Sequence, residues 1–144
     1  MSSRVTTQLL GYSGLLTFIG FCIGFSVMED CPRALSIQGF VIYSLAIFAF
    51  LAGALWWQDQ RVESASSVST LVVSNGLVLF GVASILAAQA MMATVFLMLG
   101  YIALLWYEVR ISQLEVWYRR MRVRLTTGVV IAHLLFIALH ITGA

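Results

Sequence analysis

Four long stretches of this chain contain no charged residue, and they constrain its fold more than any other feature. Residues 8–28, 37–57, 69–107 and 125–144 lack Asp, Glu, Lys and Arg altogether. The 8 basic and 6 acidic residues all lie in the short segments before and between these stretches. A helix that crosses a bilayer needs about 20 predominantly apolar residues, so each stretch predicts at least one membrane span.

The stretch at residues 69–107 is 39 residues long, which is too long for one span and suits two spans joined by a tight turn. The sequence therefore predicts an all-α fold, an integral membrane bundle of five transmembrane helices in a single domain, 1–144. Composition agrees, because only 10% of residues are charged, against roughly 25% in a soluble domain. The predicted spans lie at about 8–28, 37–57, 69–88, 91–107 and 124–142.

The first stretch has the position of a signal peptide but not its properties. Its apolar run of 21 residues exceeds the usual length of about 7–15, and no A-x-A-like site precedes Glu29. We therefore expect a retained helix. No Arg- and Ser-rich transit peptide is visible, which favours a bacterial inner membrane. A mitochondrial inner-membrane protein whose presequence has been removed would look the same.

The distribution of arginine predicts how the helices are oriented. Five spans put the two termini on opposite faces, and one face then holds the N-terminus and the segments 58–68 and 108–124. This arginine-rich face carries every arginine except Arg33. Because basic residues favour the cytoplasmic side, we expect a cytoplasmic N-terminus and a periplasmic C-terminus. All the tryptophans fall at the boundary of the same face, where amphipathic rings prefer the headgroups; they are Trp56, Trp57, Trp106 and Trp117.

Small residues recur four apart in the predicted spans. Gly20 and Gly24 form a GxxxG motif, and Ala49 with Gly53 repeats the spacing in the second span. Gly81 lies on a stripe of small residues in the third span. Small residues let helix backbones approach closely in a bilayer, so we expect these positions to pack within the bundle. Homodimerisation through the GxxxG motif is the alternative.

The segment 108–124 has a strongly amphipathic pattern. Apolar side chains recur at helical spacing while the arginines point elsewhere, which predicts a basic interfacial helix between the fourth and fifth spans. Arginine binds phosphate bidentately, so anionic lipid headgroups or membrane protein partners are the expected ligands. The alternative is that these arginines only set the topology. The predicted docking residues are Trp117, Tyr118, Arg119, Arg120, Arg122 and Arg124.

Metal and cofactor sites are not indicated. His133 and His140 lie on one face of the last span, and no other span has a histidine, which excludes an internal haem held by two histidines. A haem shared with a partner chain, or held by a methionine as second ligand, stays open. We expect instead that His133 is neutral and hydrogen-bonds a neighbouring helix. Cys22 and Cys31 are too far apart along a helix for a disulfide and belong to no metal-ligand cluster.

Catalytic and transport chemistry leave no trace in the sequence. No nucleophile–base pair or phosphate-binding loop is visible, so we predict no catalytic residue and no enzymatic activity. The four charge-free stretches that predict the spans contain no carboxylate or arginine, and the single proline, Pro32, falls in a loop. Neither a proton relay nor the broken helices of a transporter is therefore indicated. Asn75, in the third span, is expected to hydrogen-bond across helices.

Three motifs resemble those of a known family. Residues 10–16 read LGYSGLL, which is similar to G-Y-x-G-L. Tyr43 and the run FLAGALW at 50–56 are similar to Y-x(6)-F-L-G-G-x-H-W. The run WYRRMRVRLT at 117–126 is similar to W-Y-x-x-L-R-x-x-L-T. On these residues the chain resembles the small multi-span membrane proteins of domain of unknown function 3429, a family that includes mitochondrial transmembrane protein 69. Thr17 and Leu55 depart from the pattern, where the family usually has proline and histidine. The resemblance implies the fold and a membrane location, and no activity.

Three functions are compatible with these features. The leading hypothesis is a non-catalytic accessory subunit that packs against a larger inner-membrane complex, respiratory or photosynthetic. The alternative is a protein that binds a lipid or a quinone in a groove near Tyr12, Tyr43 and Tyr101. A minimal transporter is the weaker alternative, and nucleic acid is not an expected partner.

Overall fold

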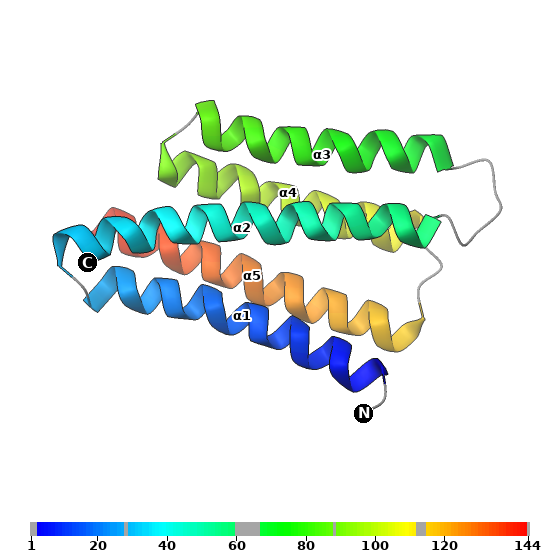
Figure 1. Ribbon diagram of the computed structural model, residues 1–144, viewed down its shortest axis with the longest axis horizontal. Coiled ribbons are helices and arrows are strands. Elements are labelled where there is room, and N and C mark those ends of the chain that lie inside the picture. Colours follow the sequence, from blue (N-terminus) through cyan, green and yellow to red (C-terminus); the bar gives the residue numbers. More distant parts are fainter. Residues whose placement is uncertain (1–2, 28, 60–66, 88, 112–114, 144) are drawn as a thin grey trace.

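Five long α-helices make up the fold (Figure 1). The computed structural model describes residues 3–27, 29–59, 67–87, 89–111 and 115–143, and no strand occurs in these ranges. All five helices are long and apolar enough to cross a membrane, which confirms the predicted all-α class and the number of spans. The helices are α1 (Ser3–Val27), α2 (Asp30–Asp59), α3 (Ser67–Ala87), α4 (Ala90–Ile111) and α5 (Val116–Thr142).

The helices extend beyond the apolar stretches that predict them. The longest, α2, has 30 residues and is therefore about 45 Å long, against a hydrocarbon core of about 30 Å. α5 begins at Val116, eight residues before the predicted start of its span at 124. Charged residues at a helix end reach water or headgroups, so they mark where the membrane ends without ending the helix.

Four of the helices form a ring. In order around the ring they are α1, α2, α4 and α5, each in contact with its two neighbours, and α3 packs from outside against α2 and α4. Figure 1 shows α3 at the edge of the bundle and α1 at the opposite edge. The interior of the ring is filled mainly by aromatic side chains, among which Phe18, Phe40, Tyr101, His133 and Phe136 are buried.

The two ends of the bundle differ in the segments they collect. α1, α3 and α5 begin at one end, where α2 and α4 finish, and the C-terminus lies at the other end (Figure 1). The described ends of the chain therefore lie at opposite ends of the bundle, as five crossings require. The end where α1 and α5 begin corresponds to the arginine-rich face.

Two close contacts between α1 and α5 pair a glycine with a leucine. A Cβ on Gly11 would lie 2.7 Å from the Leu125 side chain, and one on Gly128 would lie 2.8 Å from the Leu15 side chain. Real Cβ atoms essentially never come this close to another heavy atom, so each leucine would have to shift if the glycine carried a side chain. Two reciprocal leucine–glycine contacts thus hold these parallel helices together.

The predicted packing positions divide into two groups. A Cβ on Gly81 would lie 2.9 Å from Leu45 Cδ1 of α2, Gly24 is buried, and Ala49 is half-buried. Gly20 and Gly53 are exposed, and a Cβ on either would have no neighbouring heavy atom within 4 Å. The structure therefore differs from the packing prediction at Gly20 and Gly53. The glycines of this bundle that make close contacts pack against leucine or phenylalanine side chains of another helix, and not against a second small residue. Spacing of small residues therefore does not identify them.

The structure also differs from the predicted interfacial helix. Residues 116–124 are the first turns of α5 and continue in line with the rest of that helix (Figure 1). Met121 and Arg122 are buried on one side of these turns, while Arg119, Arg120 and Arg124 are exposed. The amphipathic pattern of this segment thus arises because one side of a membrane-spanning helix packs against its neighbours.

Candidate functional site

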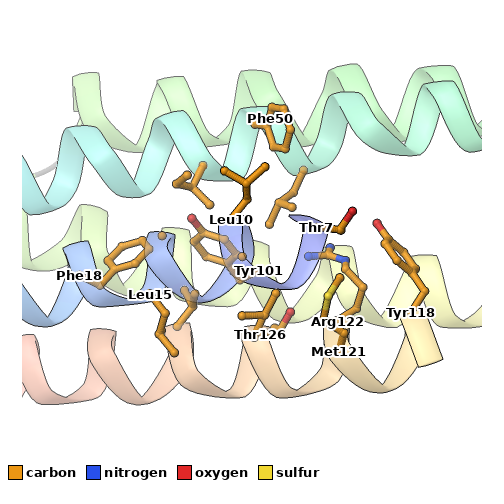
Figure 2. Close-up of a pocket in the computed structure, with 16 residues that line it drawn as sticks. Thr7, Leu10, Leu15, Phe18, Phe50, Tyr101, Tyr118, Met121, Arg122 and Thr126 are labelled. Atoms are coloured by element: carbon orange, nitrogen blue, oxygen red, sulfur yellow. The ribbon is translucent and has the colours of Figure 1, made fainter. Parts of the chain in front are cut away.

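A cleft of about 350 Å³ lies between α1, α2 and α5, with α4 behind it (Figure 2). It occupies the half of the ring nearest the start of α1 and α5, and most of its lining is apolar. The lining residues are Thr7, Leu10, Gly11, Gly14, Leu15, Phe18, Ile47, Phe50, Leu51, Tyr101, Tyr118, Met121, Arg122, Leu125, Thr126 and Val129.

The cleft is polar at one end and apolar at the other. Figure 2 shows Thr7, Arg122 and Tyr118 together at one end, and Leu15 with Phe18 at the opposite end. Thr7 and Phe18 are eleven residues apart on α1, which is about 16 Å along the helix axis. Because α1 and α5 both begin at the arginine-rich end of the bundle, the polar end of the cleft lies toward that end and the apolar end lies nearer the middle of the bundle.

A buried ion pair stands at the polar end. The Arg122 guanidinium donates from Nε and Nη2 to Oε2 of Glu108, at 2.9 and 2.7 Å. The two side chains are only 5% and 3% exposed. Charges survive such burial when they are paired and hydrogen-bonded. The pair forms because Glu108 lies in the last turns of α4 and Arg122 in the second turn of α5, and these antiparallel helices are joined by a short connection.

Tyr101 forms the floor of the cleft, and hydrogen bonds between three helices hold it in place. The Tyr101 hydroxyl of α4 donates to the Ser44 carbonyl oxygen of α2 at 2.7 Å. Ser44 Oγ lies 2.8 Å from His133 Nε2, and His133 Nδ1 lies 2.8 Å from the Val129 carbonyl oxygen. A carbonyl oxygen only accepts, so Nδ1 carries a proton; in a neutral imidazole, Nε2 then accepts from the Ser44 hydroxyl. His133 thus bonds to a neighbouring helix, and this part of the prediction for the residue is confirmed.

Aromatic rings close the apolar end. The His133 ring lies 5.0 Å from Phe40, 5.5 Å from Phe18 and 5.5 Å from Tyr101, measured between ring centroids. Phe40 also stacks on Phe136 at 4.3 Å. Since both nitrogens of His133 are engaged in hydrogen bonds, this histidine serves the packing of the ring and has no lone pair left for a metal ion.

The tyrosine groove expected from the sequence coincides with the cleft only in part. Tyr101 lines the cleft, whereas the Tyr43 hydroxyl donates to the Gly14 carbonyl oxygen at 3.3 Å and so links α2 to α1. Tyr12 is exposed on the outer surface of α1. The cleft therefore lies beside Tyr101 and is bounded by α5 rather than by the other two tyrosines.

The structure separates the predicted docking residues. Arg119, Arg120 and Arg124 are exposed, whereas Arg122 is buried in its pair with Glu108 and differs from the predicted docking role. Trp117 is half-buried; its ring nitrogen donates to the Glu115 carboxylate, and the Arg4 guanidinium lies 5.1 Å from its ring centroid. Tyr118 lines the cleft.

Sequence reasoning missed Glu108, the ion-pair partner of Arg122, and it missed Gly14 and Thr126, which line the cleft. Glu108 follows the fourth predicted span, which ends at 107, so the sequence predicts no carboxylate inside the bundle. A usable signal existed, because Glu108 and Arg122 carry opposite charges on the two sides of a short helical connection. Gly14 and Thr126 line the cleft through a tertiary arrangement that no local pattern reveals.

The remaining polar candidates lie apart from the cleft. Asn75 is exposed and donates to the Leu71 carbonyl oxygen of its own helix at 2.9 Å, so the predicted bond across helices is wrong. Cys22 is buried with a free thiol, 3.7 Å from the Ala132 carbonyl oxygen, while the Cys31 side chain lies outside the described residues. Among the residues that the structure describes, no three His, Cys, Asp or Glu side chains form a group that could hold a metal ion.

Comparison with known proteins identifies one relationship. Residues 3–138 match the model of the family described as Protein of unknown function (DUF3429). No curated protein matches the chain. No solved structure matches it either.

Proposed function

We propose that this chain, which belongs to the DUF3429 family of proteins of unknown function, is an integral membrane protein. It holds one amphiphilic, lipid-like molecule in the cleft. The observation that carries the proposal is the change of character along the cleft. Thr7, Tyr118 and Arg122 lie at the headgroup end, while Leu15 and Phe18 lie deeper. A molecule with a polar head and an apolar body fits this gradient in one orientation only.

The cleft has the properties of a ligand site rather than those of a packing fault. Its volume of about 350 Å³ falls within the usual range of small-molecule pockets, about 300–1,000 Å³. Its walls are mostly apolar with a few polar groups at one end, which is the usual composition of such pockets. The floor beneath it is fixed by the bonds of Tyr101 and His133, so its shape is set before a ligand enters.

Filling the cleft with a side chain tests the proposal. Gly14 lines the cleft, and a Cβ there would meet only the Tyr43 hydroxyl, 3.5 Å away, so a leucine has room to extend into the cleft. The matched control is Gly20→Leu on the same helix, where a Cβ has no neighbour within 4 Å. We expect mass spectrometry of the mildly solubilised protein to find a bound lipid-like molecule in the parent and in Gly20→Leu but not in Gly14→Leu. Equal amounts in all three proteins would contradict the proposal.

The exposed arginines Arg119, Arg120 and Arg124 support a second candidate, an accessory subunit of a larger inner-membrane complex. Three cations on the outer surface at one end of α5 are complementary to acidic segments of a partner or to anionic headgroups. The same purification separates the two candidates. A stoichiometric protein that remains bound in Gly14→Leu favours the subunit role, whereas a small molecule lost from Gly14→Leu favours the cleft.

The location we propose is a bacterial inner membrane with the N-terminus in the cytoplasm, and a mitochondrial inner membrane is the alternative. The support is the positive-inside rule, since basic residues gather at one end of the bundle. Glu29 and Glu115 are exposed and lie near opposite ends. In a cysteine-free background, a cysteine at position 29 should react with a membrane-impermeant maleimide added to intact cells, and one at position 115 should not. The reverse pattern would invert the proposed orientation.

A further inference from the structure

Two hydrogen-bond donors of α5 border the cleft, and neither has a hydrogen-bond partner among the described residues. Arg122 uses Nε and Nη2 for Glu108, while its Nη1 has no hydrogen-bond partner among the described residues. The Thr126 hydroxyl has none either in the part of the chain that the structure describes, although this residue is only 5% exposed. Native proteins pair nearly all of their buried polar groups, so two such donors on one wall call for an acceptor that the described residues do not supply.

The spacing of these donors suits a single polar group of a ligand. Arg122 and Thr126 are four residues apart on α5, so their side chains lie on the same face with Cβ atoms about 6 Å apart. Both residues line the same cleft (Figure 2). An arginine N–H and a threonine O–H from successive turns can therefore converge on one acceptor.

Charge decides which kind of acceptor fits. The Arg122 guanidinium already has a carboxylate 2.7 Å from Nη2, so the pair with Glu108 is neutral as a whole. An anionic headgroup placed on Nη1 would add a second negative charge close to Glu108 in a site of low dielectric constant, where like charges repel strongly. A carbonyl oxygen accepts the same hydrogen bonds without that repulsion.

We infer that the cleft selects an uncharged amphiphile whose carbonyl oxygen accepts hydrogen bonds from Arg122 Nη1 and from the Thr126 hydroxyl. Its apolar body lies along the cleft toward Phe18. This inference rests on the proposed function and names the ligand class. Carbonyl oxygens of this kind occur on a quinone ring and in the ester of a neutral glyceride.

The test measures binding to the purified full-length protein in phosphatidylcholine nanodiscs. The three probes are decylubiquinone, dioleoylglycerol and the anion oleate, each added as a mole fraction of the nanodisc lipid and followed by native mass spectrometry. We expect one of the neutral probes to bind more tightly than oleate. The probe that binds identifies whether the carbonyl comes from a quinone or from an ester.

The decisive variant is Thr126→Val, which keeps the shape and removes the hydroxyl. We expect it to bind the neutral probe about three- to tenfold more weakly, the effect of one lost hydrogen bond between neutral groups. Thr126→Ser should retain binding. The matched control is Thr127→Val, because the exposed Thr127 hydroxyl donates to the Val123 carbonyl oxygen of its own helix at 2.8 Å.

A second measurement separates ligand recognition from a structural role. If the Thr126 hydroxyl has no protein partner, the ligand-free Thr126→Val protein should be at least as stable as the parent, since an unpaired buried polar group is removed. Lower stability of the ligand-free variant would overturn the inference.

The binding outcomes are equally decisive. The inference is wrong if oleate binds as tightly as the neutral probes, if neither neutral probe binds, or if Thr126→Val binds like the parent. If one of these outcomes is found but Gly14→Leu still displaces a copurified lipid, the proposed function stands and only the inferred ligand class is wrong. When no lipid-like molecule is bound at all, both fall.

Discussion

Removing the carboxylate of Glu108 should destabilise the bundle strongly. In Glu108→Leu the Arg122 guanidinium, whose side chain is only 5% exposed, loses the acceptor of both of its hydrogen bonds. Breaking a buried ion pair by removing one partner costs about 3–5 kcal/mol, because an uncompensated charge is left behind. We expect the free energy of unfolding, measured by SDS titration with circular dichroism in mixed micelles, to fall by that amount.

Two further variants show whether the cost comes from the orphaned charge. The double variant Glu108→Leu with Arg122→Met replaces the pair by apolar side chains of similar size and should recover most of the lost stability. Glu115→Gln breaks a different pair, between Arg4 and Glu115 at 3.6 Å, whose side chains are 63% and 68% exposed. It should change stability by less than about 1 kcal/mol. If Glu108→Leu unfolds like the parent, headgroups or water solvate Arg122 and the argument from burial is wrong.

Three other outcomes follow from the packing and the surface. Ser44→Ala removes the hydroxyl that bonds His133 of α5. It should lower the free energy of unfolding by about 0.6 kcal/mol and by at most about 1.7 kcal/mol, the range for hydrogen bonds between membrane helices. An unchanged free energy of unfolding would mean that His133 finds another partner. Gly81→Leu drives a side chain into α2 and should lower the free energy of unfolding by about 1–3 kcal/mol in the same titration. Gly20→Leu should leave it almost unchanged, because a Cβ there has no neighbour within 4 Å. Equal effects would show that Gly81 is not packed more closely than Gly20. Arg120→Gln with Arg124→Gln removes two exposed cations worth about 1 kcal/mol each near an anionic surface, so anionic lipid retained in mass spectra should fall by a factor of up to about 30; unchanged lipid would leave these arginines a role in topology alone.

The membrane makes the helices predictable from the sequence. Backbone groups in hydrocarbon must bond within their own segment, so a charge-free stretch such as 37–57 has no alternative to a helix. The hydrogen bond of His133 was predictable for a related reason, since a polar ring inside a helix bundle needs a partner on a neighbouring helix. Both predictions succeed because a polar group in the hydrocarbon of a bilayer must find its hydrogen-bond partner within the protein.

The cleft was not predictable, because it depends on which helices become neighbours. Glu108 and Arg122 read as the borders of two spans, and only the antiparallel contact of α4 and α5 turns them into a buried pair. The glycine contacts show the same limit, since the GxxxG spacing pointed to Gly20, which has open space around it. Gly11 and Gly128 pack tightly because each meets a leucine of another helix, and local spacing carries no information about such partners.

Closure of the ring by α1 and α5 has a consequence for biogenesis. Helices enter the membrane in chain order during synthesis, so α2, α3 and α4 are inserted after α1 and before α5. The contacts between α1 and α5 therefore form last. Until then Gly11 and Leu15 face lipid, and Glu108 has no counter-charge from α5. An assembly intermediate without α5 therefore displays a carboxylate that lacks its arginine and an open seam, two features by which a membrane chaperone or protease can distinguish it from the finished bundle.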